Sequence, residues 1–131
     1  MKNFTLLVFV ILFLSSCAKE DITPLVTESP DGITRLYVKV TFKDCYSQQN
    51  CGNGYDFVPV ANAAVFLYKD ENSSIDDKNA LTQGLTDGHG LAKFDAVEDG
   101  QYFIEVTSSY GKKDKKVVVE AGKITRIEIR Y

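Results

Sequence analysis

Alternation of apolar and polar residues with a period of two is the feature that most constrains the fold of this chain. From residue 33 onward, short stretches such as Leu36–Phe42 and Gln101–Thr107 place apolar side chains at every second position. Successive side chains of a strand point to opposite faces of a sheet, so each stretch predicts a strand with one buried face. The segment Ala64–Tyr68 is apolar throughout, which indicates a central strand. We therefore expect strands, and no helix, from residue 33 onward.

Turn signals separate these stretches at intervals of about 8 to 15 residues. The segment Asp87–Gly90 predicts the turn of a hairpin, because glycine adopts positive φ at little cost. The expected strands cover about residues 36–42, 58–68, 80–86, 91–94, 101–107, 117–120 and 125–131. This spacing predicts an all-β, seven-stranded, antiparallel Greek-key β-sandwich over residues 33–131.

The same alternation predicts which side chains fill the space between the two sheets. Alternate residues of one strand share a face, so the apolar set of each strand is expected to point inward. The expected core residues are Leu36, Val38, Val40, Val65, Leu67, Phe94, Tyr102, Ile104, Val106, Ile127 and Ile129. The intervening polar residues, among them Lys39 and Arg130, are expected to face water.

The N-terminal residues predict export from the cytoplasm. Lys2 precedes Phe4–Leu14, an apolar run of 11 residues broken only by a threonine, which is the layout of a secretory signal peptide. A membrane-spanning helix needs about 20 apolar residues. The following LSSC, which ends at Cys17, resembles the lipobox of bacterial lipoproteins. That resemblance implies that residues 1–16 are removed, and that Cys17 carries lipid on its thiol and its new amine.

The residues after Cys17 indicate a tether and an address. Residues 17–32 lack periodicity and contain two of the three prolines, so we expect a flexible tether. The segment Ala18–Asp21 resembles the acidic export signal of lipoproteins displayed on the outer face of the bacterial outer membrane. The resemblance implies a surface-exposed location, and a periplasm-facing outer-membrane location is the alternative.

The cysteine count and the charge restrict the partners further. The net charge is −3, and about −4 once Lys2 is removed, which gives no reason to expect nucleic acid as a partner. Cys45 and Cys51 are the two cysteines that remain beside Cys17. In an exported protein they predict a disulfide, worth roughly 2 kcal/mol for so short a loop. A zinc site would want four ligands, which two cysteines and one distant histidine do not supply.

Two longer segments carry a family resemblance. VPVANAAVFLYKD and LTQGLTDGHGLAKFDAVEDGQYFIEV resemble the prealbumin-like sandwich of carboxypeptidase regulatory-like and collagen-binding B-type domains. The likeness covers about residues 34–131 and rests on a T-D-x-x-G-x-A-x-F element at Thr86–Phe94 and a G-x-Y-x-I-x-V element at Gly100–Val106. It implies the fold and leaves the function open, because this sandwich hosts many roles.

Candidate chemistry in the chain is sparse, and no cofactor or metal is expected. His89 is the only histidine and lies in a glycine turn, whereas the enzymes of this fold group use several histidines. The isopeptide bond of collagen-binding B-type domains would use Lys39 or Lys43 with Glu105. The last strand, ITRIEIRY, has no asparagine or aspartate to accept that bond. The acidic loop at residues 70–79 misses the spacing of a calcium loop, so we expect a solvated loop, with calcium binding as the open alternative.

One feature predicts a contact surface. Tyr46, Tyr55 and Phe57 flank the expected disulfide loop, where they would either contact a partner or cap one end of the core. We expect a lipid-anchored, non-enzymatic module that binds a protein or a glycan at the cell surface. The alternative is a structural spacer or assembly subunit that uses its sheet edges, since unpaired edges are templates for other strands. An enzyme is a minor alternative.

Overall fold

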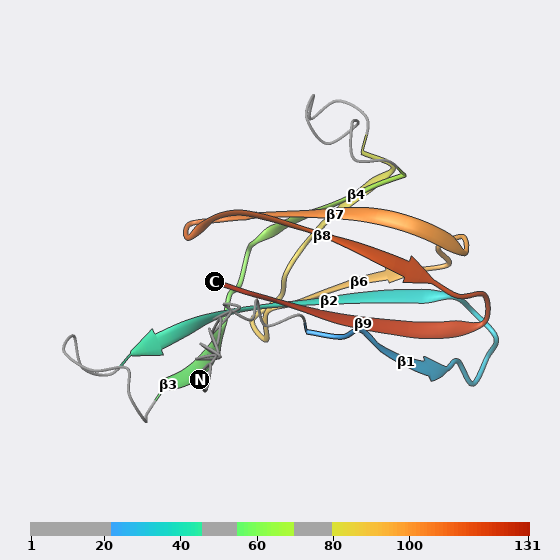
Figure 1. Cartoon of the computed structure of the whole chain (residues 1–131), viewed down its shortest axis with the longest axis horizontal. Helices are drawn as coiled ribbons and strands as arrows, with labels where there is room; N and C mark the ends of the chain where they lie inside the picture. Colours follow the sequence, from blue (N-terminus) through green and yellow to red (C-terminus); the bar gives the residue numbers. More distant parts are fainter. Residues whose placement is uncertain (1–21, 46–54, 70–79) are drawn as a thin grey trace, which may run out of the picture.

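The chain is a two-layer β-sandwich in which two sheets face each other (Figure 1). The computed structural model describes residues 22–45, 55–69 and 80–131. Within these ranges it contains nine strands and no helix. The strands are β1 (Leu25–Glu28), β2 (Arg35–Cys45), β3 (Tyr55–Pro59), β4 (Ala64–Tyr68), β5 (Thr82–Leu85), β6 (Leu91–Asp95), β7 (Gly100–Ser108), β8 (Gly111–Val119) and β9 (Lys123–Arg130). The predicted all-β sandwich is confirmed.

The larger sheet, here called sheet A, is built around β2. Its order is β1-β9-β2-β3, and β6 also pairs with β2. β6 pairs antiparallel with the first half of β2, from Arg35 to Lys39, and β3 pairs with the second half, from Thr41 to Cys45. The pairing of β2 with β9 is parallel, a departure from the purely antiparallel prediction. The first long strand and the last strand of the sandwich therefore lie side by side.

The smaller sheet, sheet B, has the order β5-β4-β7-β8 and is antiparallel throughout. β4 pairs with β5 on one side and with β7 on the other, which confirms the prediction that Ala64–Tyr68 is a central strand. β8 includes Lys112–Lys116, which lie outside the predicted strands. Edge strands rich in lysine are common, because the charges discourage pairing with another chain.

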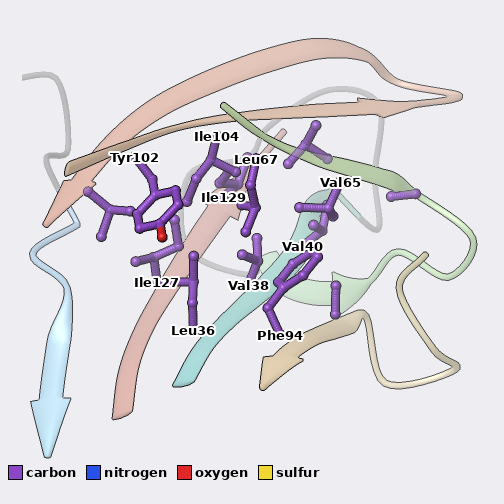
Figure 2. Packing of buried hydrophobic residues seen from close by; sticks show 14 of the residues in the cluster. Leu36, Val38, Val40, Val65, Leu67, Phe94, Tyr102, Ile104, Ile127 and Ile129 are labelled. Carbon is purple, nitrogen blue, oxygen red and sulfur yellow. The ribbon is translucent and has the colours of Figure 1, made fainter. Parts of the chain in front are cut away.

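The core lies between the two sheets and has the predicted composition. All eleven predicted core residues are buried and belong to one hydrophobic cluster. Figure 2 shows Leu36, Val38 and Ile127 of sheet A meeting Leu67 and Ile104 of sheet B. The alternation of apolar and polar residues therefore predicted correctly which face of each strand points inward.

The number of strands is larger than the seven predicted. The stretch 58–68, taken as one extended region, is divided into β3 of sheet A and β4 of sheet B. The chain changes sheets at residues 60–63, where Asn62 adopts φ of 58°. The buried hydroxyl of Thr86 holds this crossover, because it accepts from the Ala63 amide at 2.9 Å and donates to the Val60 carbonyl at 2.6 Å.

The turn at Asp87–Gly90 is present, but the predicted hairpin is not. β5 on one side of the turn belongs to sheet B, and β6 on the other side belongs to sheet A. One carboxylate oxygen of Asp87 accepts hydrogen bonds from the backbone amides of His89 and Leu91, at 2.9 and 3.0 Å. The segment therefore forms the predicted tight turn, but the two strands that flank it pair in different sheets.

β1 corrects the predicted start of the domain at residue 33. Residues 17–32 are predicted to form a flexible tether, yet Leu25–Glu28 pair antiparallel with Arg126–Lys123 of β9. All four β1 residues are exposed, so main-chain pairing and surface contacts such as the Arg126–Thr27 hydrogen bond hold this strand without a buried side chain. The sandwich therefore begins before residue 33.

Candidate functional site

An open groove of about 350 Å³ crosses the outer face of sheet A. Its lining residues include Ile22 and Leu25 at the N-terminal end, Tyr37 and Lys39 of β2, Leu91 of β6, and Arg126 and Glu128 of β9. Strand register brings these residues together, because Leu25, Arg126 and Tyr37 are neighbours across three strands, as are Glu128, Lys39 and Leu91. Those of β2 and β9 alternate with inward residues such as Val38 and Ile127.

Tyr37 lies at the centre of the groove between two cations. The Arg126 guanidinium lies 5.5 Å, and the Lys93 ammonium 5.9 Å, from the centroid of the Tyr37 ring. At these distances a cation is attracted by the ring face. None of the salt bridges between described residues involves Lys39, Lys93 or Arg126. The groove therefore presents positive charge and an aromatic ring to a ligand.

Glu128 is the one carboxylate in the groove, and its charge is already matched. Arg130 donates to it at 2.9 Å, and the buried hydroxyl of Thr41 donates to its other oxygen at 3.0 Å. The Arg130 hydrogen bond is the main reason that the pKa of Glu128 lies below its usual range. Glu128 is therefore ionised at neutral pH, and the ion pair with Arg130 offsets its negative charge.

The β2–β3 hairpin extends this face beyond the rest of the sandwich. β9 pairs with β2 only as far as Thr41, whereas β3 accompanies β2 to the pair Cys45–Tyr55 (Figure 1). Phe57 is half-buried on this hairpin, on the same face as the groove. The Arg130 guanidinium lies 4.2 Å from the centroid of its ring. Phe57 and Arg130 thus connect the hairpin to the groove.

The other residues of the predicted contact loop are outside what the structure describes. Tyr46 and Cys51 lie outside the described residues, and for Cys45 and Tyr55 only the strand positions are described. The Cys45–Cys51 disulfide therefore stays a prediction. The lipidation of Cys17 and the calcium binding of residues 70–79 also fall outside the described ranges.

The remaining candidates do not assemble into a reactive site. His89 is exposed in its turn, and the Asp87 carboxylate beside it bonds backbone amides, chiefly that of Leu91, which lowers the pKa of Asp87. Lys39 lies on the outer face of sheet A, whereas Glu105 lies on the outer face of sheet B, where it is buried and bonds Lys112 at 2.8 Å. Among the described residues, no three His, Cys, Asp or Glu side chains are grouped so that they could hold a metal ion.

The groove itself was missed by sequence reasoning. Its central residues, Tyr37, Leu91 and Arg126, come from three strands that are far apart in the chain. The available signal was the outward positions of the predicted strands, several of which carry a cation or an aromatic ring. That signal becomes a site only when the strand order is known.

Comparison with known proteins supports the fold and leaves the function open. No protein-family model and no curated protein sequence matches the chain. A solved structure that does match is the minor pilin of the Gram-positive pathogen Streptococcus agalactiae, with a TM-score of 0.53 and 16% sequence identity. The match covers 76% of this chain and 44% of the pilin, so the chain corresponds to less than half of that protein. At this identity the similarity shows a shared β-sandwich fold. In the part of the chain that the structure describes, no helix is long and apolar enough to cross a membrane.

Proposed function

We propose that this chain is a lipid-anchored, non-enzymatic module of the bacterial outer membrane that binds a protein or a glycan at the cell surface. The observation that carries the proposal is the projecting β2–β3 hairpin, whose Phe57 lies beside Arg130 of β9 on one face. Aromatic and arginine side chains dominate the binding energy of many interfaces. The lipobox-like LSSC ending at Cys17 supports the anchor, and the acidic segment Ala18–Asp21 supports the surface address.

Arrays of purified proteins and glycans, probed with the mature chain, test the binding function. Phe57→Ala is expected to abolish the strongest signals, because it removes the aromatic side chain of the hairpin. Phe66→Ala is the matched control, since Phe66 is also a half-buried phenylalanine but lies on the outer face of sheet B. Equal losses in the two variants, or no signal for the wild-type chain, would contradict binding through the hairpin.

Membrane partitioning tests the anchor separately. Cys17→Ser is expected to release the protein from membranes or to leave it uncleaved, because serine cannot take a thioether-linked lipid. Fractionation and the intact mass of the product measure both effects. Normal processing together with unchanged detergent partitioning would exclude lipidation of Cys17.

A second candidate function is that of a structural or assembly subunit. β1 favours it, because this edge strand of sheet A is exposed along its whole length and pairs only with β9 in the described part of the chain. The neighbour of similar fold is a minor pilin, which adds a reason to test assembly. Sedimentation of the mature chain over a range of concentrations decides between the two functions. Polymers together with flat arrays would favour the structural function.

A further inference from the structure

The outer face of sheet A has a charge opposite to that of the protein as a whole. Its described strand positions carry six cations, namely Arg35, Lys39, Lys43, Lys93, Arg126 and Arg130. They carry two carboxylates, Asp95 and Glu128. The full chain has a net charge of −3. Such segregation orients a protein in front of an anionic surface.

Some cations on the outer face of sheet A take part in salt bridges between described residues, and others do not. Arg35 pairs with Asp31 and Asp95, and Arg130 pairs with Glu128. Lys39, Lys93 and Arg126 take part in none of the salt bridges among described residues. The available cations therefore surround Tyr37 and the groove.

The groove also lies close to the proposed lipid anchor. Ile22 lines it and is five residues after Cys17, so the intervening chain spans at most about 18 Å. Lys115 of β8 donates a hydrogen bond to the Ile22 carbonyl, which fixes where the chain leaves the sandwich. A protein held at Cys17 therefore keeps this face within a short distance of the membrane.

We propose that the outer face of sheet A docks on the membrane that holds Cys17, with its cations against the phosphates of the lipid headgroups. The proposal rests on the lipidation of Cys17 included in the proposed function. Tyr37 and Leu91 fit such an interface, since a tyrosine ring with an apolar body and a polar tip is favoured between apolar and aqueous layers. The hairpin with Phe57 then lies at the rim of the docked face, where a partner meets it beside the membrane.

Vesicle binding by the mature chain carrying Cys17→Ser tests the docking without the anchor. We expect it to bind vesicles that contain phosphatidylglycerol, to ignore vesicles of pure phosphatidylcholine, and to dissociate as salt is added. Lys39→Gln combined with Arg126→Gln should lower the partition coefficient roughly 30-fold, because two cations near an anionic surface are removed. Lys69→Gln combined with Lys116→Gln is the control, with the same change of charge on exposed positions of sheet B and its end.

Lysine acylation of the lipidated protein provides a second readout that needs no variant. In vesicles, compared with detergent, Lys39 and Lys93 should react more slowly while Lys69 and Lys116 are unchanged. The docking proposal would be overturned if the two double variants had equal effects or if the protein did not bind anionic vesicles. It would also be overturned if the change in reactivity between detergent and vesicles were the same at all four lysines. These results are independent of the arrays and of the partitioning of Cys17→Ser, so a failure of docking is distinguishable from a failure of the proposed function.

Discussion

At the scale of single residues, Gly90 has the least room for a side chain among the glycines that the structure describes. Its φ is +71°, and an added Cβ would lie 2.4 Å from the carbonyl oxygen of Val40. That oxygen accepts from the Val60 amide at 2.9 Å, and the Gly90 carbonyl accepts from the Val40 amide at 2.7 Å. One glycine therefore lets three segments meet: the turn, β2 and the crossover to β4.

We predict that Gly90→Ala destabilises the protein by at least about 1 to 3 kcal/mol, the usual cost of strained backbone, because the clash with Val40 adds to the strain. Gly88→Ala in the same turn should change stability by no more than roughly 0.5 kcal/mol, since nothing lies within 4 Å of its added Cβ. Urea denaturation of both variants measures the difference. Similar midpoints for the two variants would contradict the close approach at Gly90.

Glu128 predicts a dependence of stability on pH. Its hydrogen bonds from Arg130 and Thr41 hold the folded-state pKa below the ordinary value of 4.5. The ionised carboxylate therefore stabilises the fold at pH values above the unfolded-state pKa, and this contribution is lost as the pH falls through the folded-state pKa. The free-energy difference between wild type and Glu128→Gln should shrink on acidification below about pH 4.5. A difference that stays constant during that acidification would contradict the assignment.

At the scale of elements, β1 and β4 represent two extremes of stabilisation. β4 lies between two strands and buries Val65 and Leu67 completely, whereas β1 lies at an edge with all four side chains exposed. We predict that the ladder amides of β1 exchange hydrogen through local opening, far faster than those of β4 and β7, which exchange through global unfolding. Native-state hydrogen exchange measures this directly. Protection of β1 equal to that of β7 would show that side-chain packing, rather than main-chain pairing alone, holds the strand.

The elements also show where sequence reasoning stops. Alternation correctly predicted the faces of β2, β4 and β7, because a residue's face depends only on its own strand. It could not predict that β5 and β6 join different sheets, since a tight turn is compatible with both arrangements. It also missed β1, because a strand of four exposed residues has no buried face to reveal it.

At the scale of the whole molecule, the core supports a direct test. Leu67 and Ile104 are fully buried and are register partners across β4 and β7. Truncating either one to alanine should cost about 2 to 5 kcal/mol, whereas Lys39→Gln should cost within roughly 0.5 kcal/mol. Thermal melts compare the three variants, and equal losses at Leu67 and Lys39 would mean that the sheet faces are wrongly assigned. Arg130, expected from sequence to face water, contacts Glu128 and Phe57 and is therefore unsuitable as a control.

The groove also depends on the whole molecule, because residues from distant parts of the chain form it. Its residues were visible in sequence as outward positions of strands, but their grouping required the order β1-β9-β2 and the addition of β6 to β2. The parallel pairing of β2 with β9 sets Arg126 beside Tyr37 and Glu128 beside Lys39. Period-two patterns do not encode such long-range pairings, so the fold class was predictable and the site was not.

The parallel pairing has a mechanical consequence when opposite forces are applied before β1 and at Tyr131. β1 is antiparallel to β9, so the load reaches its pairs one after another and peels the strand away at low force. β2 is parallel to β9, so the same pull acts along both strands in opposite directions. All seven register pairs from Arg35–Ile124 to Thr41–Arg130 are then loaded in shear at once. We therefore expect β1 to detach first at low force. The β2–β9 pairs should then resist further extension together.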